Sequence, residues 1–101
     1  MGGFMQPQGH LQVVSNLVDC GMDPQQALEA PRFRCLEGAQ VAVEPAIGQA
    51  VIEALAQLGH ELQIDLPYGG FGGGQVIAID WDEGVLQAGS DPRKDGCAMG
   101  Y

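Results

Sequence analysis

Hydroxyl and imidazole side chains are the first places to look for chemistry, because nucleophilic hydrolysis needs such a group beside a base. The chain contains no threonine, and its serines are Ser15 and Ser90. Ser15 falls inside a predicted helix, and Ser90 opens a turn with no histidine near it in the sequence. Neither follows a nucleophile-elbow motif, so the sequence does not favour an independent serine hydrolase.

Metal and redox chemistry are not indicated either. The three cysteines, Cys20, Cys35 and Cys97, are an odd number at wide spacing, which gives neither a CxxC motif nor a closed disulfide framework. His10 and His60 lie far apart without a neighbouring ligand pattern. We therefore expect reduced cysteines, no metal site and no cofactor.

The glycine-rich segment at residues 68–75 suggests a phosphate-binding loop at first sight. Phosphate loops of known mechanism lead into a helix N-terminus, and the Walker form also ends in Gly-Lys-Ser/Thr. Here the glycines lead into the apolar run at residues 76–79, which is typical of a strand. We interpret the loop as architectural, with glycines that permit close backbone packing.

The negative net charge argues against nucleic acids and anionic membranes as partners. Thirteen acidic residues against four basic ones give a net charge of -9, whereas nucleic acids and anionic membranes bind clustered Lys and Arg. No apolar run approaches the ~20 residues of a membrane span, and the first residues lack the basic region of a signal peptide. We expect no nucleic acid or membrane partner, and the sequence leaves the compartment unknown.

Arg32 and Arg93 are each expected to have a carboxylate partner, since basic residues are so few. The simplest partners for Arg93 are Asp91 and Asp95, its neighbours in sequence. We interpret Arg32, Arg93 and Asp91 as structural, holding strand ends and the tail in place.

Three helices are predicted to position these residues. The first covers residues 11–20 and begins near Pro7, with Leu11, Val14, Leu17 and Val18 on its apolar face. The second begins at the Asp23-Pro24 cap and ends near Ala30, and the third covers residues 45–59.

Five strands complete the chain. They are predicted at residues 32–36 and 40–44, which pair in antiparallel fashion, at 60–66 with Leu62, Ile64 and Leu66 inward, at 75–81, and at 85–88 after a turn at 82–84. The strand at 75–81 is apolar on both faces, which predicts cover on both sides. Residues 89–101 are expected to form an ordered loop. The fold class is α+β, with a mostly antiparallel sheet, and residues 1–101 form one domain or part of one.

Several motifs, taken together, resemble one family. They are Gly2-Gly3, Gln6-Pro7-Gln8-Gly9-His10, Ala30-Pro31-Arg32-Phe33, Gly73-Gly74-Gln75, and Ser90-Asp91-Pro92-Arg93 with Gly100-Tyr101. In this order and spacing the chain resembles the C-terminal part of gamma-glutamyltranspeptidase. The resemblance implies part of an αββα N-terminal-nucleophile hydrolase, whose precursor cleaves itself and exposes a threonine nucleophile. Lacking threonine, the chain is expected to be a small-subunit segment that starts after the nucleophile.

The resemblance also implies a site. Gly2 and Gly3 match the glycine pair whose backbone N–H groups form the family's oxyanion hole, while no substrate-binding residue carries over. The parent enzyme would transfer or hydrolyse gamma-glutamyl groups of glutathione or related amides, and its partners would be the rest of the precursor and that substrate. The segment alone is expected to be inactive and to self-associate. A free-standing binding or scaffold domain is the alternative.

Overall fold

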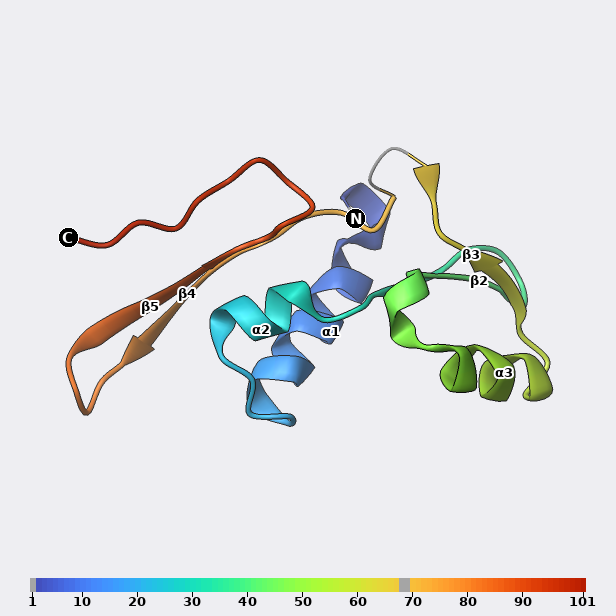
Figure 1. Cartoon of the computed structure of the whole chain (residues 1–101), viewed down its shortest axis with the longest axis horizontal. Coiled ribbons are helices and arrows are strands. Elements are labelled where there is room, and N and C mark those ends of the chain that lie inside the picture. Colours follow the sequence, from blue (N-terminus) through green and yellow to red (C-terminus); the bar gives the residue numbers. More distant parts are fainter. Residues whose placement is uncertain (1, 68–69) are drawn as a thin grey trace.

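The computed structural model describes residues 2–67 and 70–101, so Tyr68 and Gly69 of the predicted glycine loop lie outside the described residues (Figure 1). Its helices are α1 (Gln6–Val18), α2 (Pro24–Glu29) and α3 (Gln49–Gln57), with 3-10 turns η1 (Gly3–Met5) and η2 (Pro45–Ile47). Its strands are β1 (Phe33–Cys35), β2 (Gln40–Val43), β3 (Glu61–Ile64), β4 (Gln75–Asp80) and β5 (Val85–Ser90). The predicted α+β class with three helices is confirmed.

The described strands form two separate sheets. One has the order β1-β2-β3 and the other is the β4-β5 hairpin. β1 pairs with β2 and β4 with β5 in antiparallel fashion, as predicted, whereas β2 and β3 are parallel. A parallel pair needs a crossover, and η2 and α3 supply it. The third helix does not begin at Pro45 as predicted, because Gly48, with φ of 93°, separates η2 from α3.

The molecule is elongated, with extents of 46 × 27 × 23 Å (Figure 1). Its radius of gyration is 15.0 Å, compared with about 13 Å for a compact domain of this length. Its accessible surface is 6938 Å², whereas a compact monomer of this mass exposes roughly 5,500 Å². The excess comes from element faces that nothing in the chain covers.

The β4-β5 hairpin carries much of this exposed surface. The prediction that β4 is covered on both faces is wrong for this chain, because Ile77 is 69% exposed and Trp81 83% exposed. The physical reason is that the hairpin forms a two-stranded arm, which contacts α2 only near its base (Figure 1). Ile64 of β3, predicted to point inward, is likewise exposed.

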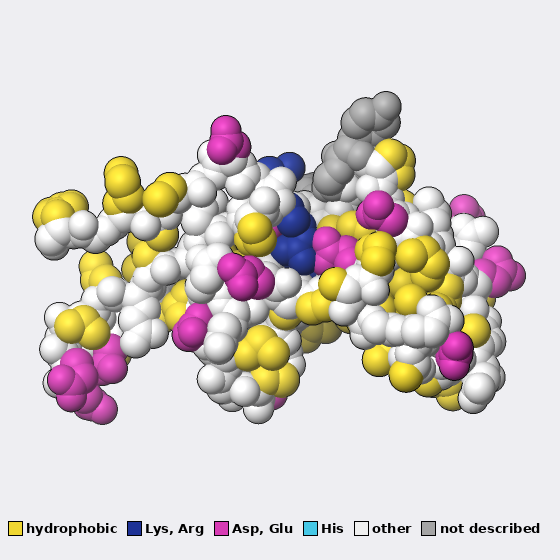
Figure 2. All heavy atoms as spheres, viewed as in Figure 1, with side chains coloured by type: hydrophobic (Ala, Val, Ile, Leu, Met, Phe, Trp, Pro, Cys, Tyr) yellow, Lys and Arg dark blue, Asp and Glu magenta, His cyan; other side chains and the backbone are white. Residues whose placement is uncertain are grey.

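Helix α1 has the reverse orientation to the predicted one. Three of its predicted core residues, Leu11, Val14 and Val18, are exposed. Its polar face turns toward the protein instead, where Gln12 hydrogen-bonds the backbone of Phe33. Apolar side chains are therefore visible over much of the surface (Figure 2).

The small core lies where α2, β2 and the glycine-rich segment meet. Its buried apolar residues are Ala27, Leu28, Val41, Ala42, Val43 and Phe71. The predicted N-cap of α2 is a capping box in which Asp23 and Gln26 satisfy each other's backbone N–H groups. β5 crosses the start of α2 so closely that a Cβ at Gly89 would lie 2.7 Å from the backbone of Pro24. Glycine at this position permits the crossing.

Candidate functional site

Arg32 lies at the centre of a buried polar cluster. Its side chain is 5% exposed, and its Nη2 donates to Oδ2 of Asp91 over 2.6 Å. Its Nη1 also donates to the carbonyl of Phe71, and Nη2 to that of Leu28. Asp91, which is fully buried, also accepts from the N–H of Gly74 at 2.9 Å. The pair therefore joins α2, the glycine-rich segment and the end of β5.

Arg93 extends the cluster toward β2. Its Nε and Nη2 donate to the two carboxylate oxygens of Glu44 over 2.6 and 2.5 Å, a bidentate arrangement. Its Nη1 donates to Asp91 and to the carbonyl of Leu28, so one guanidinium bridges both carboxylates. The expected partner Asp91 is present, whereas no pairing with Asp95 occurs among the described residues. The four charges sum to zero.

Glu44 was missed by sequence reasoning. It follows β2 and precedes η2, and besides Arg93 it accepts a hydrogen bond from the backbone N–H of Arg32 at 2.8 Å. Nothing in its neighbourhood in sequence indicates a partner so distant in the chain.

In Figure 2 basic side chains gather near the middle of the molecule, with acidic side chains beside them.

The cluster shifts the protonation of its own carboxylates. Burial raises the pKa of Glu44, but hydrogen bonds from Arg93 and from the backbone of Arg32, with both positive charges, leave it below its ordinary value. For Asp91, burial again raises the pKa, and hydrogen bonds from Arg93, Arg32 and Gly74 outweigh it. Hydrogen bonding to Glu44 raises the pKa of Arg93. All three groups are therefore ionised at neutral pH.

These shifts predict acid lability. A carboxylate whose folded-state pKa is lowered stabilises the fold fully above its ordinary value, here 3.8 for Asp91 and 4.5 for Glu44. That stabilisation is lost as pH falls through the lowered values. We expect the melting temperature, measured by circular dichroism at constant ionic strength, to fall steeply below about pH 4.5. The melting temperature of Glu44→Gln should fall less steeply with decreasing pH. A fall as steep as in the wild type would contradict the role given to Glu44.

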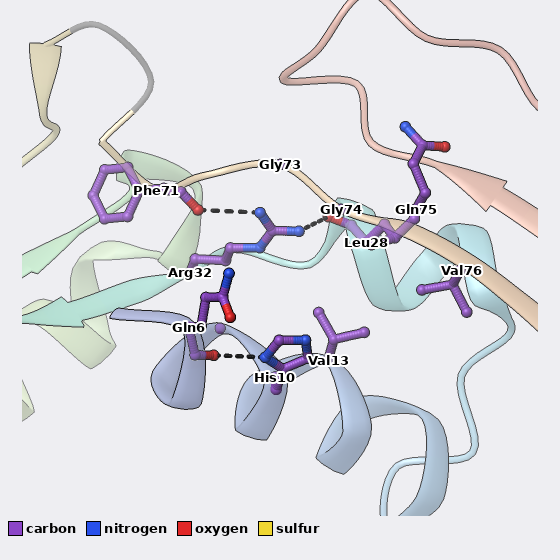
Figure 3. Close-up of a pocket in the computed structure, with 11 residues that line it drawn as sticks. Gln6, His10, Val13, Leu28, Arg32, Phe71, Gly73, Gly74, Gln75 and Val76 are labelled. Atoms are coloured by element: carbon purple, nitrogen blue, oxygen red, sulfur yellow. Dashed lines mark hydrogen bonds between the residues drawn. The ribbon is translucent and has the colours of Figure 1, made fainter. Parts of the chain in front are cut away.

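Beside the cluster lies a hollow of about 310 Å³ between α1 and the start of β4 (Figure 3). Its lining includes Gln6 and His10 of α1 on one side, and Arg32, Phe71 and Gly74 on the other. The Arg32 guanidinium reaches the Phe71 carbonyl across the top of this view. Because Asp91 already neutralises Arg32, the hollow carries no unmet charge of its own.

Gly2 and Gly3 lie at the start of a helical segment in which η1 runs directly into α1. The first N–H groups of a helix have no intrahelical acceptor, and none is found for Gly2 or Gly3 among the described residues. Gly3 has φ of +55°, a conformation that L side chains rarely adopt. A Cβ at either position would meet nothing within 4 Å in this chain. The N–H groups of Gly2 and Gly3 are therefore without an acceptor in the described part of the chain.

The remaining reactive side chains do not assemble into a site in the described part of the chain. Ser15 donates to Asp19, the residue that follows α1, and Ser90 Oγ is buried without a partner in the described part of the chain. The three cysteines are exposed and free. No group of three metal-ligating side chains occurs within residues 2–67 and 70–101. None of the helices described is both long enough and apolar enough to cross a membrane.

Comparison with known proteins gives a consistent picture. A family model described as gamma-glutamyltranspeptidase matches residues 1–101. The glutathione hydrolase-like YwrD proenzyme of Bacillus subtilis (strain 168) is 37% identical over 98% of this chain and 20% of its own length. The acylase ACY 1 proenzyme of Pseudomonas sp. (strain SE83) is 40% identical over 85% of this chain and 15% of its own length.

A solved structure agrees in detail. The crystal structure of cephalosporin acylase from Bacillus halodurans matches with a TM-score of 0.91 and 48% identity, over 100% of this chain and 19% of that one. The described helices and strands are thus part of an N-terminal-nucleophile hydrolase fold. The chain spans a fifth or less of the length of the curated relatives above. With a family model matched from end to end, the chain belongs to the gamma-glutamyltranspeptidase family.

Proposed function

We propose that this chain is the C-terminal segment of the small subunit of an amide-cleaving enzyme that is made as a precursor and processed into two subunits. Relatives named as proenzymes support the precursor, and the excess surface of the chain supports a large complementary partner. That partner is the large subunit together with the N-terminal part of the small subunit. The segment supplies part of the active site and lacks the nucleophile.

The contribution of the segment is the pair of N–H donors at Gly2 and Gly3. When a threonine hydroxyl adds to the carbonyl carbon of an amide, the carbonyl oxygen becomes an oxyanion, and the amine then leaves with a proton. Water or a second amine next releases the acyl group from the threonine. Donors fixed at the oxyanion position stabilise both tetrahedral states, and a single such donor is worth about 3 kcal/mol. The observation that carries the proposal is that Gly2 and Gly3, which match the family's glycine pair, have N–H groups at a helix N-terminus with no acceptor among the described residues.

The substrate class is an acylated amine, of which a gamma-glutamyl amide is the first candidate. One relative is named as glutathione hydrolase-like and another structure as a cephalosporin acylase, so both kinds of amide belong in the assay. We expect the full-length gene product to turn over a gamma-glutamyl anilide or an acyl cephalosporin. The 101-residue chain alone should turn over neither. Turnover by the isolated chain would overturn the proposal.

The isolated chain is also expected to self-associate. Ile77 and Leu86 project from the hairpin arm and are 69% and 70% exposed, and β4 and β5 each leave one edge unpaired by a strand. Exposed apolar faces beside open edges recruit other strands, and α1 offers a second apolar face for exchange.

Sedimentation velocity at micromolar concentration tests this prediction. The wild-type chain should sediment as a dimer or larger species, and Ile77→Lys with Leu86→Lys should shift it toward monomer. The control variant is Gln57→Lys with Gln63→Lys, which adds the same charge at exposed positions of α3 and β3. It should leave the association in place. A monomeric wild-type chain would contradict the prediction.

A further inference from the structure

Two glutamines of α1 hydrogen-bond the outer edge of β1. The side chain of Gln12 accepts from the N–H of Phe33 at 3.0 Å and donates to its carbonyl at 2.9 Å. Gln8 does the same with Cys35, accepting at 2.8 Å and donating at 3.3 Å. Each amide thus satisfies both backbone groups of one residue. A neighbouring strand would satisfy the same groups in the same way.

The glutamines can bond two residues of β1 because the residue spacing along a helix nearly equals that along a strand. Residues four apart on a helix are separated by about 6 Å along its axis, and residues two apart on a strand by about 6.8 Å. Gln8 and Gln12 are four apart, and Phe33 and Cys35 are two apart, with their backbone groups on the edge of β1 away from β2. Two glutamines at this spacing therefore bond alternate residues of an edge strand. They also fix both the rotation of the helix and its position along the strand.

Apart from these hydrogen bonds, α1 packs mainly against α2. The helix contains no buried residue, and Leu11, Val14 and Val18 on its outer face are exposed. Within the described residues, its other side-chain hydrogen bond to an element beyond η1 and α1 runs from Asn16 to the carbonyl of Ala27 at 3.4 Å. The two glutamines are therefore the main directional link between α1 and the three-stranded sheet.

The start of α1 carries the donors of the proposed site. Gly3 begins η1, and η1 continues into α1 without an intervening loop, so the N–H groups of Gly2 and Gly3 move with the helix. We propose that Gln8 and Gln12 are positioning residues that set the placement of the oxyanion donors by pairing α1 with β1. This inference rests on the proposed function, because it assigns the glutamines a role in the same reaction.

The test uses the full-length gene product with Gln12 replaced by Met and by Glu. Methionine keeps the size and removes both hydrogen bonds, so kcat should fall about 10- to 100-fold with KM nearly unchanged, as expected for misplaced transition-state donors. Gln57→Met and Gln57→Glu are matched controls at an exposed position on α3. They should leave both constants unchanged.

Gln12→Glu separates positioning from general destabilisation. An ionised carboxylate can accept from the N–H of Phe33 but cannot donate to its carbonyl, whereas a protonated carboxyl can do both, as the amide does. Partial burial beside the Phe33 carbonyl favours the protonated carboxyl and raises its pKa above the ordinary value of about 4.3. The ratio of variant to wild-type kcat should therefore rise as pH falls from about 8 to about 5. The Met variant should show no such recovery. A ratio that stays flat with pH in both variants would overturn the positioning role, and so would an unchanged kcat in Gln12→Met.

Hydrogen exchange of the peptide covering residues 31–36 gives a readout that does not depend on turnover. Gln12→Met should increase exchange at Phe33, and Gln57→Met should not. If the wild-type enzyme cleaves no acylated amine, the proposed function and the catalytic part of this inference both fail. The exchange result then still decides whether the glutamines hold α1 on β1, and unchanged exchange would overturn that part.

Discussion

Replacing Asp91 by alanine should lower the free energy of unfolding by about 3–5 kcal/mol, the cost of breaking a buried ion pair from one side. Asp91 is fully buried and accepts hydrogen bonds from Arg32, Arg93 and the N–H of Gly74. Without it, the Arg32 guanidinium stays at 5% exposure with its carboxylate partner gone. Such a loss is a large part of the 5–15 kcal/mol typical of a whole domain.

Urea denaturation followed by circular dichroism measures this effect. Asp95→Ala is the matched control, because it makes the same change four residues further along the tail, at an exposed side chain. It should cost less than about 0.5 kcal/mol, as surface substitutions usually do. Similar losses in the two variants would show that the cluster does not hold the chain together.

A double variant examines the cause of the loss. If the cost of Asp91→Ala comes from the unpaired charge of Arg32, then removing that charge as well should recover part of it. Arg32→Met keeps the length of the side chain and removes the guanidinium. The double variant should therefore be less destabilised than the sum of the two single variants. Strict additivity would place the cost in lost packing instead.

Local sequence signals predicted most of the fold. The Asp23-Pro24 cap predicted both ends of α2 to within one residue, because the residues of its capping box are neighbours in the chain. The β4 start at Gln75 agrees as well, while β5 continues two residues beyond its predicted end at Ala88. These elements were accessible because hydrogen bonding between near neighbours, and strand pairing across a short turn, leave a clear pattern in the sequence.

The faces of the elements were not predictable in the same way. An apolar stripe on α1 indicates that the stripe is buried somewhere, not that this chain buries it. Here Gln8 and Gln12 turn inward because β1 has an unpaired edge, and that edge is set by a strand more than twenty residues away. Under the proposed function, the exposed apolar residues of α1 and β4 are the surfaces that would contact the rest of the precursor.

The ion pairs of the buried cluster were likewise only partly predictable from the sequence. That Arg32 and Arg93 would have acidic partners followed from the scarcity of basic residues, and Asp91 was among those expected for Arg93. The pairing of Arg32 with Asp91 spans 59 positions, and that of Arg93 with Glu44 spans 49. Only the folded chain brings such residues together, since no local spacing specifies these contacts.

Replacing Gly3 by alanine should lower kcat of the full-length enzyme about 100-fold or more, the effect of losing one oxyanion donor. Gly3 has φ of +55°, and an alanine there costs about 1 kcal/mol of backbone strain. Relaxing that strain toward negative φ rotates the peptide groups on either side, including the N–H groups that we propose as donors. Because these groups act on the transition state, the loss should appear in kcat more than in KM.

Gly38→Ala is the control that separates strain from chemistry. Gly38 has φ of +58° in the turn between β1 and β2, and a Cβ there, as at Gly3, meets nothing within 4 Å. The two substitutions should therefore reduce stability by similar amounts, measured by urea denaturation of the processed enzyme, while only Gly3→Ala abolishes most of the activity. Equal kcat in the two variants would remove Gly3 from the site. A selective loss would make the left-handed backbone at Gly3 a requirement of catalysis, because the fold itself tolerates the extra methyl group.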